Sequence, residues 1–265
     1  MMPSPAARWQ PRTFTMLRLT SILLLASWCL PATKTLWHAL DVPVFRLLNG
    51  SLGHWPVWDF VWALLSTRVA DVLAAVLMLC SLIVGGLVFD QHGLRRALVS
   101  FIALLVCTLI VRTLFTRFID AAGLQHASPS AFLGDGFSLS QAFPWMEQFM
   151  EIKDRSSRSF PGDHASVLLL WAAFLSLFAR GKRLLLLWLT GIVLLLPRLV
   201  AGAHWLSDNL VGGGFVVMQT LAWGYYTAAG DWIYRFLDRL AEPCVRLARK
   251  IPLVGRLAIL HEAQH

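Results

Sequence analysis

The sequence predicts an all-α, polytopic membrane protein, and three observations lead to this fold class. Of the 265 residues, 57% are hydrophobic and only 14% are charged, whereas soluble domains carry roughly 45–50% apolar and about 25% charged residues. The mean hydropathy is +0.62. Long apolar runs recur along the chain, separated by polar stretches. This composition excludes intrinsic disorder and argues against a water-soluble globule.

Six apolar runs approach the length of about 20 residues that a membrane-spanning helix needs. They are Met16–Leu36, Val69–Phe89, Ala97–Phe118, His164–Ala179, Leu184–Ala203 and Leu206–Ala228. We predict one domain over residues 1–265, with an N-terminal segment (1–15), a six-span core (16–228) and a tail (229–265). The first run resembles a signal peptide, but no cleavage site follows it cleanly, so a retained anchor is the preferred interpretation.

Lys and Arg gather in alternate connecting segments, and this pattern sets the orientation. Basic residues precede the first run, lie between the second and third and between the fourth and fifth, and follow the sixth. Such loops stay in the cytoplasm, so both termini are predicted to be cytoplasmic. The net charge of +8 forms no continuous basic stripe, and we therefore expect no nucleic-acid partner.

Three segments outside the spans carry further signals. Residues 37–68 are rich in tryptophan, which favours the lipid interface, and predict short interfacial helices on the non-cytoplasmic side. Residues 119–163 are too long for a simple connector, and long ordered loops are usually functional. After Gly230, apolar residues alternate with arginines. This pattern indicates either an amphipathic helix on the cytoplasmic membrane surface or a plain solubilising tail.

Two polar segments lie at the non-cytoplasmic ends of the predicted spans. The first is Ser159–His164, with the sequence S-F-P-G-D-H, and the second is Pro197–Asp208, with the sequence P-R-L-V-A-G-A-H-W-L-S-D. The predicted topology brings both segments to one membrane face. Because ionisable residues at membrane depth are costly, the two segments predict a functional site.

The residue types at this site point to phosphoryl transfer. His204 and Asp208 are four positions apart and share one face of a helix. Asp208 can therefore accept a hydrogen bond from one ring N–H and leave the other nitrogen of His204 as a nucleophile. Arg198 offers a planar fork that matches phosphate oxygens. His164 opens a helix whose free amides favour an anion, and it can act as a general acid.

Each signal taken alone has a simpler interpretation. A histidine at the end of a span is often only an interfacial polar residue, and Asp163 can merely complement the helix dipole. A His-x3-Asp pair can also bind a divalent metal. The fixed cation of Arg198 argues instead for an anionic ligand. We predict neither a metal nor a cofactor at the site.

The spacing Arg198-x5-His204-x3-Asp208 resembles the third signature of the type 2 phosphatidic acid phosphatase superfamily. Pro161-Gly162-Asp163-His164 stands where that family has P-S-G-H. The resemblance implies a six-helix membrane core and a metal-independent phosphohistidine mechanism. By this resemblance, His204 is the nucleophile, Asp208 its orienting partner, His164 the general acid and Arg198 a phosphate ligand.

The departures from the family pattern narrow the resemblance to one branch. The sequence K-D-x-S-x-x-S-F-P-G-D-H, together with P-R-x-x-x-G-A-H-W-x-x-D, is similar to the lipid A 1-diphosphate synthases. The likeness in layout extends to Thr67-Arg68-x-x-Asp71. The first family signature is not legible, and the residues nearest to its place follow the third span. The phosphate ligands expected from this resemblance are Arg198, Gly162, Asp163, Lys153, Arg117 and His126.

The resemblance implies a transferase of the bacterial inner membrane with its site on the periplasmic face. It would move the terminal phosphate of undecaprenyl diphosphate onto the 1-phosphate of lipid A. A periplasmic-facing phosphatase acting on undecaprenyl diphosphate or phosphatidylglycerophosphate is the alternative, because the first half-reaction is identical. A transporter is a third hypothesis. It would spread its charges through the depth of the spans, whereas here they gather at one face.

Overall fold

The computed structural model describes residues 9–84, 88–89 and 93–252. Within this part, every regular element is a helix, and the only β-type pairing is an isolated antiparallel bridge between Thr67 and Ile152. The predicted all-α class is confirmed. Parts of the N-terminal segment and of the tail, at 1–8 and 253–265, lie outside the described residues.

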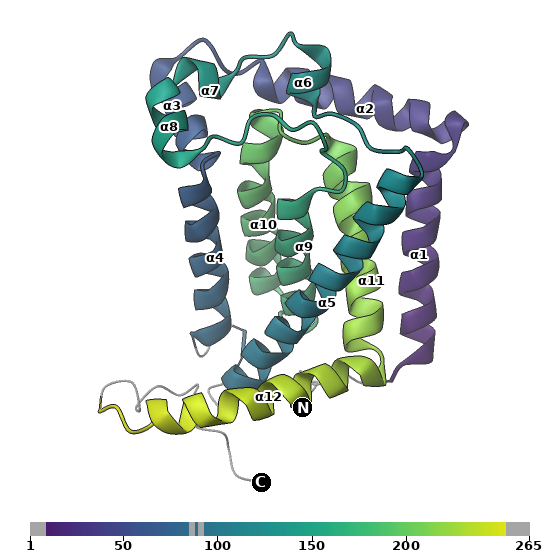
Figure 1. Ribbon diagram of the computed structural model, residues 1–265, viewed down its shortest axis with the longest axis vertical. Coiled ribbons are helices and arrows are strands. Elements are labelled where there is room, and N and C mark those ends of the chain that lie inside the picture. Colours follow the sequence, from purple (N-terminus) through teal and green to yellow (C-terminus); the bar gives the residue numbers. More distant parts are fainter. Residues whose placement is uncertain (1–8, 85–87, 90–92, 253–265) are drawn as a thin grey trace.

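Long helices stand side by side and form a bundle (Figure 1). They are α1 (Pro11–Cys29), α4 (Arg68–Ile83), α5 (Leu94–Ala121), α9 (Asp163–Ser176), α10 (Lys182–Val200) and α11 (Gly214–Tyr225). Helix α11 packs against α1, α5 and α9. The largest buried apolar cluster joins these helices through residues such as Phe101, Phe174 and Leu221.

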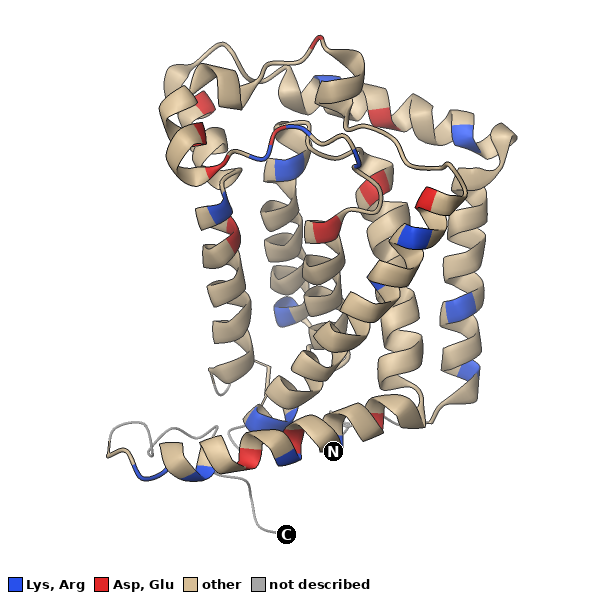
Figure 2. Cartoon of the chain, in the orientation of Figure 1, with Lys and Arg blue, Asp and Glu red and all other residues tan. Residues whose placement is uncertain are grey.

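A second group of helices covers one end of the bundle, which we call the loop end (Figure 1). They are α2 (Pro31–Asn49), α3 (Pro56–Leu65), α6 (Pro129–Leu133), α7 (Leu139–Ala142) and α8 (Pro144–Met150). Helix α12 (Ala228–Ala248) crosses the opposite end. Figure 2 shows the charged residues gathered mainly at these two ends, with few along the middle of the bundle.

The first predicted span is wrong at its end. The run Met16–Leu36 was expected to be one helix, but α1 stops at Cys29 and α2 starts at Pro31 after a bend of 83°. Leu30 precedes a proline, which disfavours the helical conformation, and its backbone is extended at φ −72° and ψ 130°. The bend turns α2 across the loop end. Helix α2 itself contains some of the residues that were predicted to form interfacial helices.

The remaining predicted spans each contain a helix. The sixth begins with a π-helical segment, η2 (Asp208–Gly213), which continues directly into α11. Single π-turns inside helices often mark functional positions, and here the segment starts at Asp208. In the second predicted span, helix α4 ends at Ile83 rather than at Phe89.

The number of membrane crossings is only partly supported. Among the described residues, α5 and α10 are long and apolar enough to cross a membrane, and the bent pair of α1 and α2 would make a third crossing if it counts as one span. Helix α9 is apolar but short. A membrane protein is indicated, and the count of six spans stays a prediction.

Helix α12 is attached to the bundle by a buried arginine. The guanidinium of Arg95, on α5, donates to Asp238 at 2.9 and 3.1 Å and to Glu242 at 2.7 Å. Trp232, Phe236 and Leu240, one helical turn apart, are exposed. Helix α12 therefore contacts the bundle through the ion pairs of Arg95 and carries exposed apolar residues.

Candidate active site

A tight turn after α10 places His204 beside Arg198. Gly202 has φ +78°, and a Cβ at this position would come within 2.7 Å of the Phe45 ring, so both conformation and space require glycine. The amides of Ala203 and His204 then donate to the carbonyl of Arg198 at 2.9 and 3.3 Å. The turn thus brings the ends of two predicted spans to one corner of the loop end.

The imidazole of His204 is oriented by a backbone carbonyl. Its Nδ1 lies 2.9 Å from the Ser159 oxygen, and it lies 3.5 Å from the nearer carboxylate oxygen of Asp208. A carbonyl can only accept, so the proton of a neutral ring sits on Nδ1 and Nε2 carries the lone pair. Asp208 was expected to fix this tautomer, but Ser159 makes the shorter contact.

Asp208 is fully buried and its two oxygens have other donors. Oδ1 lies 2.9 Å from Nε2 of His126, and Oδ2 accepts from the Trp205 amide at 2.8 Å. His126 was expected to be a phosphate ligand. The structure instead places its Nε2 on the buried carboxylate, within the group of residues that surrounds His204.

Arg198 is buried and binds a carboxylate from another helix. Its Nη2 donates to both oxygens of Asp71, at 2.7 and 2.5 Å, and its Nη1 donates to the carbonyl of Ser66 at 2.8 Å. Asp71 lies in the first turn of α4. No role of Asp71 was predicted from the Thr67-Arg68-x-x-Asp71 motif, because a contact between two distant helices leaves no local pattern in the sequence.

His164 faces the same carboxylate. Its Nδ1 lies 3.5 Å from Asp71 Oδ1, and its Nε2 lies 3.3 Å from the carbonyl of Leu194. The ring is also within electrostatic range of Arg198 and His204. His164, Arg198 and His204, predicted to meet, are therefore gathered at one corner of the fold.

Gly162 and Asp163 contact neighbouring protein groups. The Gly162 amide donates to the Asp208 carbonyl at 3.1 Å, and a Cβ on Gly162 would lie 2.5 Å from Asn209 Oδ1. This close approach joins the first turn of α9 to η2. Asp163 accepts from Arg112 of α5 at 2.6 Å. Its carboxylate is therefore an ion-pair partner of Arg112, and its expected contact with the phosphate stays a prediction.

Of the two other expected phosphate ligands, Lys153 lies beside the site and Arg117 does not. The Lys153 amide donates to Ser66 at 2.9 Å, beside Arg198, while its ammonium contacts Glu151. Glu151 also accepts from Arg68 at 2.5 Å. These two donors hold the pKa of Glu151 at about 2, below its usual value of 4.5. Arg117 is exposed on α5 and makes no ion pair among the described residues, so the structure does not bring it into the site.

An apolar groove of about 310 Å³ runs from this corner between α4, α5 and α9. Asp71 and His164, from the first turns of α4 and α9, are its polar residues. Side chains farther along the helices continue the groove, including Met78, Leu82, Phe101 and Leu105. The groove therefore has one polar end, beside Arg198, and an apolar body.

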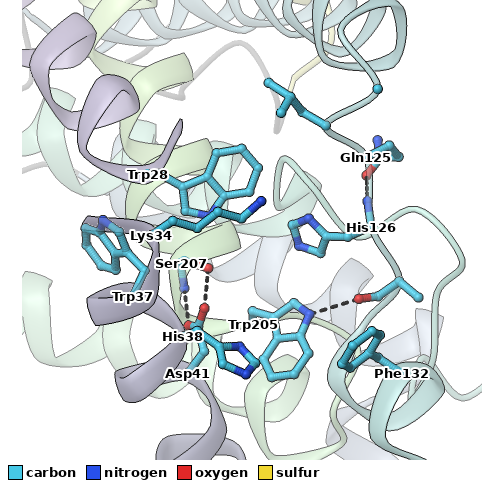
Figure 3. Close-up of a pocket in the computed structure, with 13 residues that line it drawn as sticks. Trp28, Lys34, Trp37, His38, Asp41, Gln125, His126, Phe132, Trp205 and Ser207 are labelled. Carbon is cyan, nitrogen blue, oxygen red and sulfur yellow. Dashed lines mark hydrogen bonds between the residues drawn. The ribbon is translucent and has the colours of Figure 1, made fainter. Parts of the chain in front are cut away.

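A second cavity of about 250 Å³ has His126, Trp205 and Ser207 among its lining residues (Figure 3). It is lined by residues of α2, of the segment after α5, and of the segment that follows His204. No residue lines both this cavity and the groove. Within the described residues, no group of three or more His, Cys, Asp or Glu side chains is arranged to hold a metal ion.

The amino-acid sequence around this site matches a known family. Residues 103–234, which contain His126, His164, Arg198, His204 and Asp208, match the PAP2 superfamily. Lipid A 1-diphosphate synthase of Escherichia coli (strain K12) is 26% identical over 224 residues, which covers 84% of this chain and 91% of that protein. The resemblance drawn from the two signatures is confirmed. No solved structure matches the chain.

Proposed function

We propose that this chain, whose residues 103–234 match the PAP2 superfamily, is a lipid phosphotransferase. Its donor is undecaprenyl diphosphate and its acceptor is the 1-phosphate of lipid A. Its products are undecaprenyl phosphate and lipid A 1-diphosphate. The related E. coli protein, named for synthesis of this product, supports the choice. The proposed site lies on the periplasmic face of the inner membrane, with both termini cytoplasmic.

The observation that carries the proposal is the position of the polar cluster at one end of the apolar groove. His164 and Asp71 belong to the groove lining, and Arg198 is bonded to Asp71. A lipid diphosphate has the same division, with an anionic head and a long apolar chain. The groove suits the first isoprene units of the donor, and the guanidinium suits its terminal phosphate.

In the proposed first step, Nε2 of His204 attacks the terminal phosphorus of the donor. A nitrogen–phosphorus bond forms, and the bond to the bridging oxygen of undecaprenyl phosphate breaks. His164 gives its proton to that oxygen. Both ring nitrogens of His164 face acceptors, the Leu194 carbonyl and the Asp71 carboxylate, which suits a ring that must hold a proton until this step.

In the proposed second step, an oxygen of the lipid A 1-phosphate attacks the phosphohistidine. The new oxygen–phosphorus bond completes the diphosphate, the nitrogen–phosphorus bond breaks, and the acceptor's proton returns to His164. Arg198 compensates the charge of the transferred group in both steps. Since the cluster is fixed by buried contacts, catalysis would come mainly from positioning.

The experiment follows the label of undecaprenyl diphosphate carrying a radioactive terminal phosphate. Purified protein in liposomes receives this donor with or without lipid A and without added metal. Label that moves to lipid A with little free phosphate is the expected result. Label released as phosphate whether or not lipid A is present would make the protein a phosphatase, which is the alternative with the same first half-reaction.

Two variants link the label transfer to the proposed chemistry. His204→Ala removes the nucleophile and His164→Ala removes the acid, and each should abolish turnover while the protein still inserts and purifies. His54→Ala is the matched control, because His54 is an exposed histidine of the loop end. Near-normal turnover by purified His204→Ala would sink the phosphohistidine mechanism.

A further inference from the structure

The second cavity, at the bend between α1 and α2, has the residues of a binding site. Lys34, His38 and Asp41 lie on one face of α2, four and three positions apart, and all three line it. Gln125 and His126 come from the segment after α5. Figure 3 shows these side chains and Trp205 around one opening.

The position of Lys34 in this cavity favours an anion. Lys34 is exposed, lies 5.5 Å above the Trp28 ring and makes no ion pair with any described carboxylate. His38 is also exposed, with its ring 6.2 Å from that of Trp205. Asp41 is the one carboxylate of the lining, and it accepts from the Ser207 amide at 2.8 Å and hydroxyl at 2.6 Å. The carboxylate of Asp41 is thus held by hydrogen bonds within the protein, whereas the ammonium of Lys34 stays exposed at the opening.

The aromatic lining adds a second preference. Trp28, Trp37, Phe132 and Trp205 all contribute to the walls. The indole nitrogen of Trp205 donates to the Ala127 carbonyl at 2.9 Å, which fixes the ring. Flat aromatic faces pack well against the apolar faces of sugar rings, and their polar edges tolerate water. A ligand with sugar rings and negative charge matches both sets of groups.

The cavity adjoins the proposed reaction centre. Trp205 follows His204 directly in the chain, and Ser207 precedes Asp208. His126, in the lining, lies 2.9 Å from Asp208, which in turn lies 3.5 Å from His204. The groove proposed for the donor shares no residue with it. A transferase needs places for two lipids, whereas a hydrolase needs only one.

We propose that this cavity binds the phosphorylated sugar headgroup of the acceptor lipid, with Lys34 and His38 on a phosphate and the tryptophans on the sugar. The inference rests on the proposed phosphotransferase function and deepens it. A phosphate at Lys34 is a second contact of the acceptor, separate from the phosphate that attacks at His204. Lys34 and His38 then select the acceptor and play no part in the donor half-reaction.

The test compares two reactions of the purified full-length protein in liposomes. The first is label transfer to lipid A. The second is label exchange from undecaprenyl diphosphate to a shorter polyprenyl phosphate, which uses only the donor half-reaction and its reversal. Lys34→Ala and Lys34→Glu should raise the KM for lipid A by about tenfold or more, as loss of a charge-assisted bond implies. They should leave exchange within about twofold, and Lys34→Arg should restore transfer.

The matched control is Arg46→Ala, which removes a cation of the same helix outside the cavity. Arg46 is exposed, pairs with Asp135 and does not line the cavity. It should leave both reactions unchanged. An unchanged KM for lipid A in Lys34→Glu would overturn the inference alone. Exchange without any transfer to lipid A by the unaltered protein would instead overturn the proposed function, and the inference with it.

Competition distinguishes the class of anion. The acyl-free phosphorylated disaccharide of lipid A should inhibit transfer in the unaltered protein and inhibit it much less in Lys34→Ala. Phosphatidylglycerol and inorganic phosphate share the negative charge and lack the sugar. They should inhibit far more weakly at equal concentration. Equal inhibition by either one would overturn the assignment of a sugar-binding site.

Discussion

Arg198 donates to both carboxylate oxygens of Asp71, which therefore occupies the position of an anionic ligand on the guanidinium. The same carboxylate lies 3.5 Å from Nδ1 of His164. In the proposed reaction a phosphate on Arg198 would compete with Asp71, while the carboxylate of Asp71 favours the protonated form of His164. One residue thus opposes substrate binding and supports the proposed proton transfer.

Asp71→Asn should separate these two effects. A neutral amide competes less for Arg198, so the KM for the donor should fall. His164, the proposed general acid, loses its charged partner, so kcat should fall by about tenfold. This loss is smaller than the roughly 100- to 10,000-fold that general acid catalysis contributes. Steady-state kinetics at several donor concentrations measure both constants. Asp135→Asn, whose partner Arg46 is exposed, is the control. An unchanged kcat or a raised KM would contradict the double role.

The sequence predicted the location of the site because its signals are local. Each apolar run contains a helix, and consecutive antiparallel helices bring His164, Arg198 and His204 to one end. Pro31 also marks the bend that ends α1, although the apolar run continues past it. A run of hydrophobic residues reports burial in lipid or protein, and it does not report direction.

The partners of the site residues were not predictable in the same way. Asp71 lies 127 positions from Arg198, and helix tilt decides whether two such residues meet. The hydrogen-bond acceptor for His204 is the backbone carbonyl of Ser159. Every residue has a backbone carbonyl, so the sequence does not single this one out. Asp208 was expected to orient His204, four positions before it, yet its 2.9 Å partner is His126 in a different loop. Such contacts depend on tertiary geometry.

Replacing His126 should lower stability and kcat together. Its imidazole is the partner of the buried oxygen Oδ1 of Asp208, and an unsatisfied buried acceptor costs about 1–3 kcal/mol. His126→Ala should lose that free energy of unfolding and slow turnover, with the donor KM little changed. Chemical denaturation in detergent and steady-state kinetics provide the two measurements. If His126 bound the donor phosphate instead, the KM would rise while stability held.

The ion pairs of Glu151 predict a pH dependence of stability. Arg68 and Lys153 hold its pKa at about 2 in the folded protein, below the ordinary value of 4.5. A depressed pKa stabilises the folded state above the unfolded value, and this contribution disappears as pH falls through the folded value. The melting temperature of Glu151→Gln should therefore lie below that of the unaltered protein at pH 5–7. The two should converge between pH 4.5 and 2, and a gap that widens on acidification would refute this assignment.

Gly202→Ala tests whether the turn before His204 is required for activity. The substitution forces an L-residue to φ +78° and drives a methyl group to 2.7 Å from the Phe45 ring. The backbone strain alone costs about 1–3 kcal/mol. Gly181→Ala supplies the matched control, because Gly181 has φ +58° and nothing within 4 Å of its added Cβ. The loss of stability in Gly181→Ala measures the free-energy cost of the positive φ angle without a steric clash.

The two glycine variants should then differ in kinetics as well as in stability. Gly181 precedes α10 at the end opposite the site, so its variant should keep normal kcat. To relieve the clash at position 202, the turn has to move. This turn holds the hydrogen bond from the His204 amide to the Arg198 carbonyl. Turnover should fall by at least tenfold under conditions where both variants are fully folded. Equal activity of the two would mean that His204 is positioned by Ser159 and Asp208 without help from this turn.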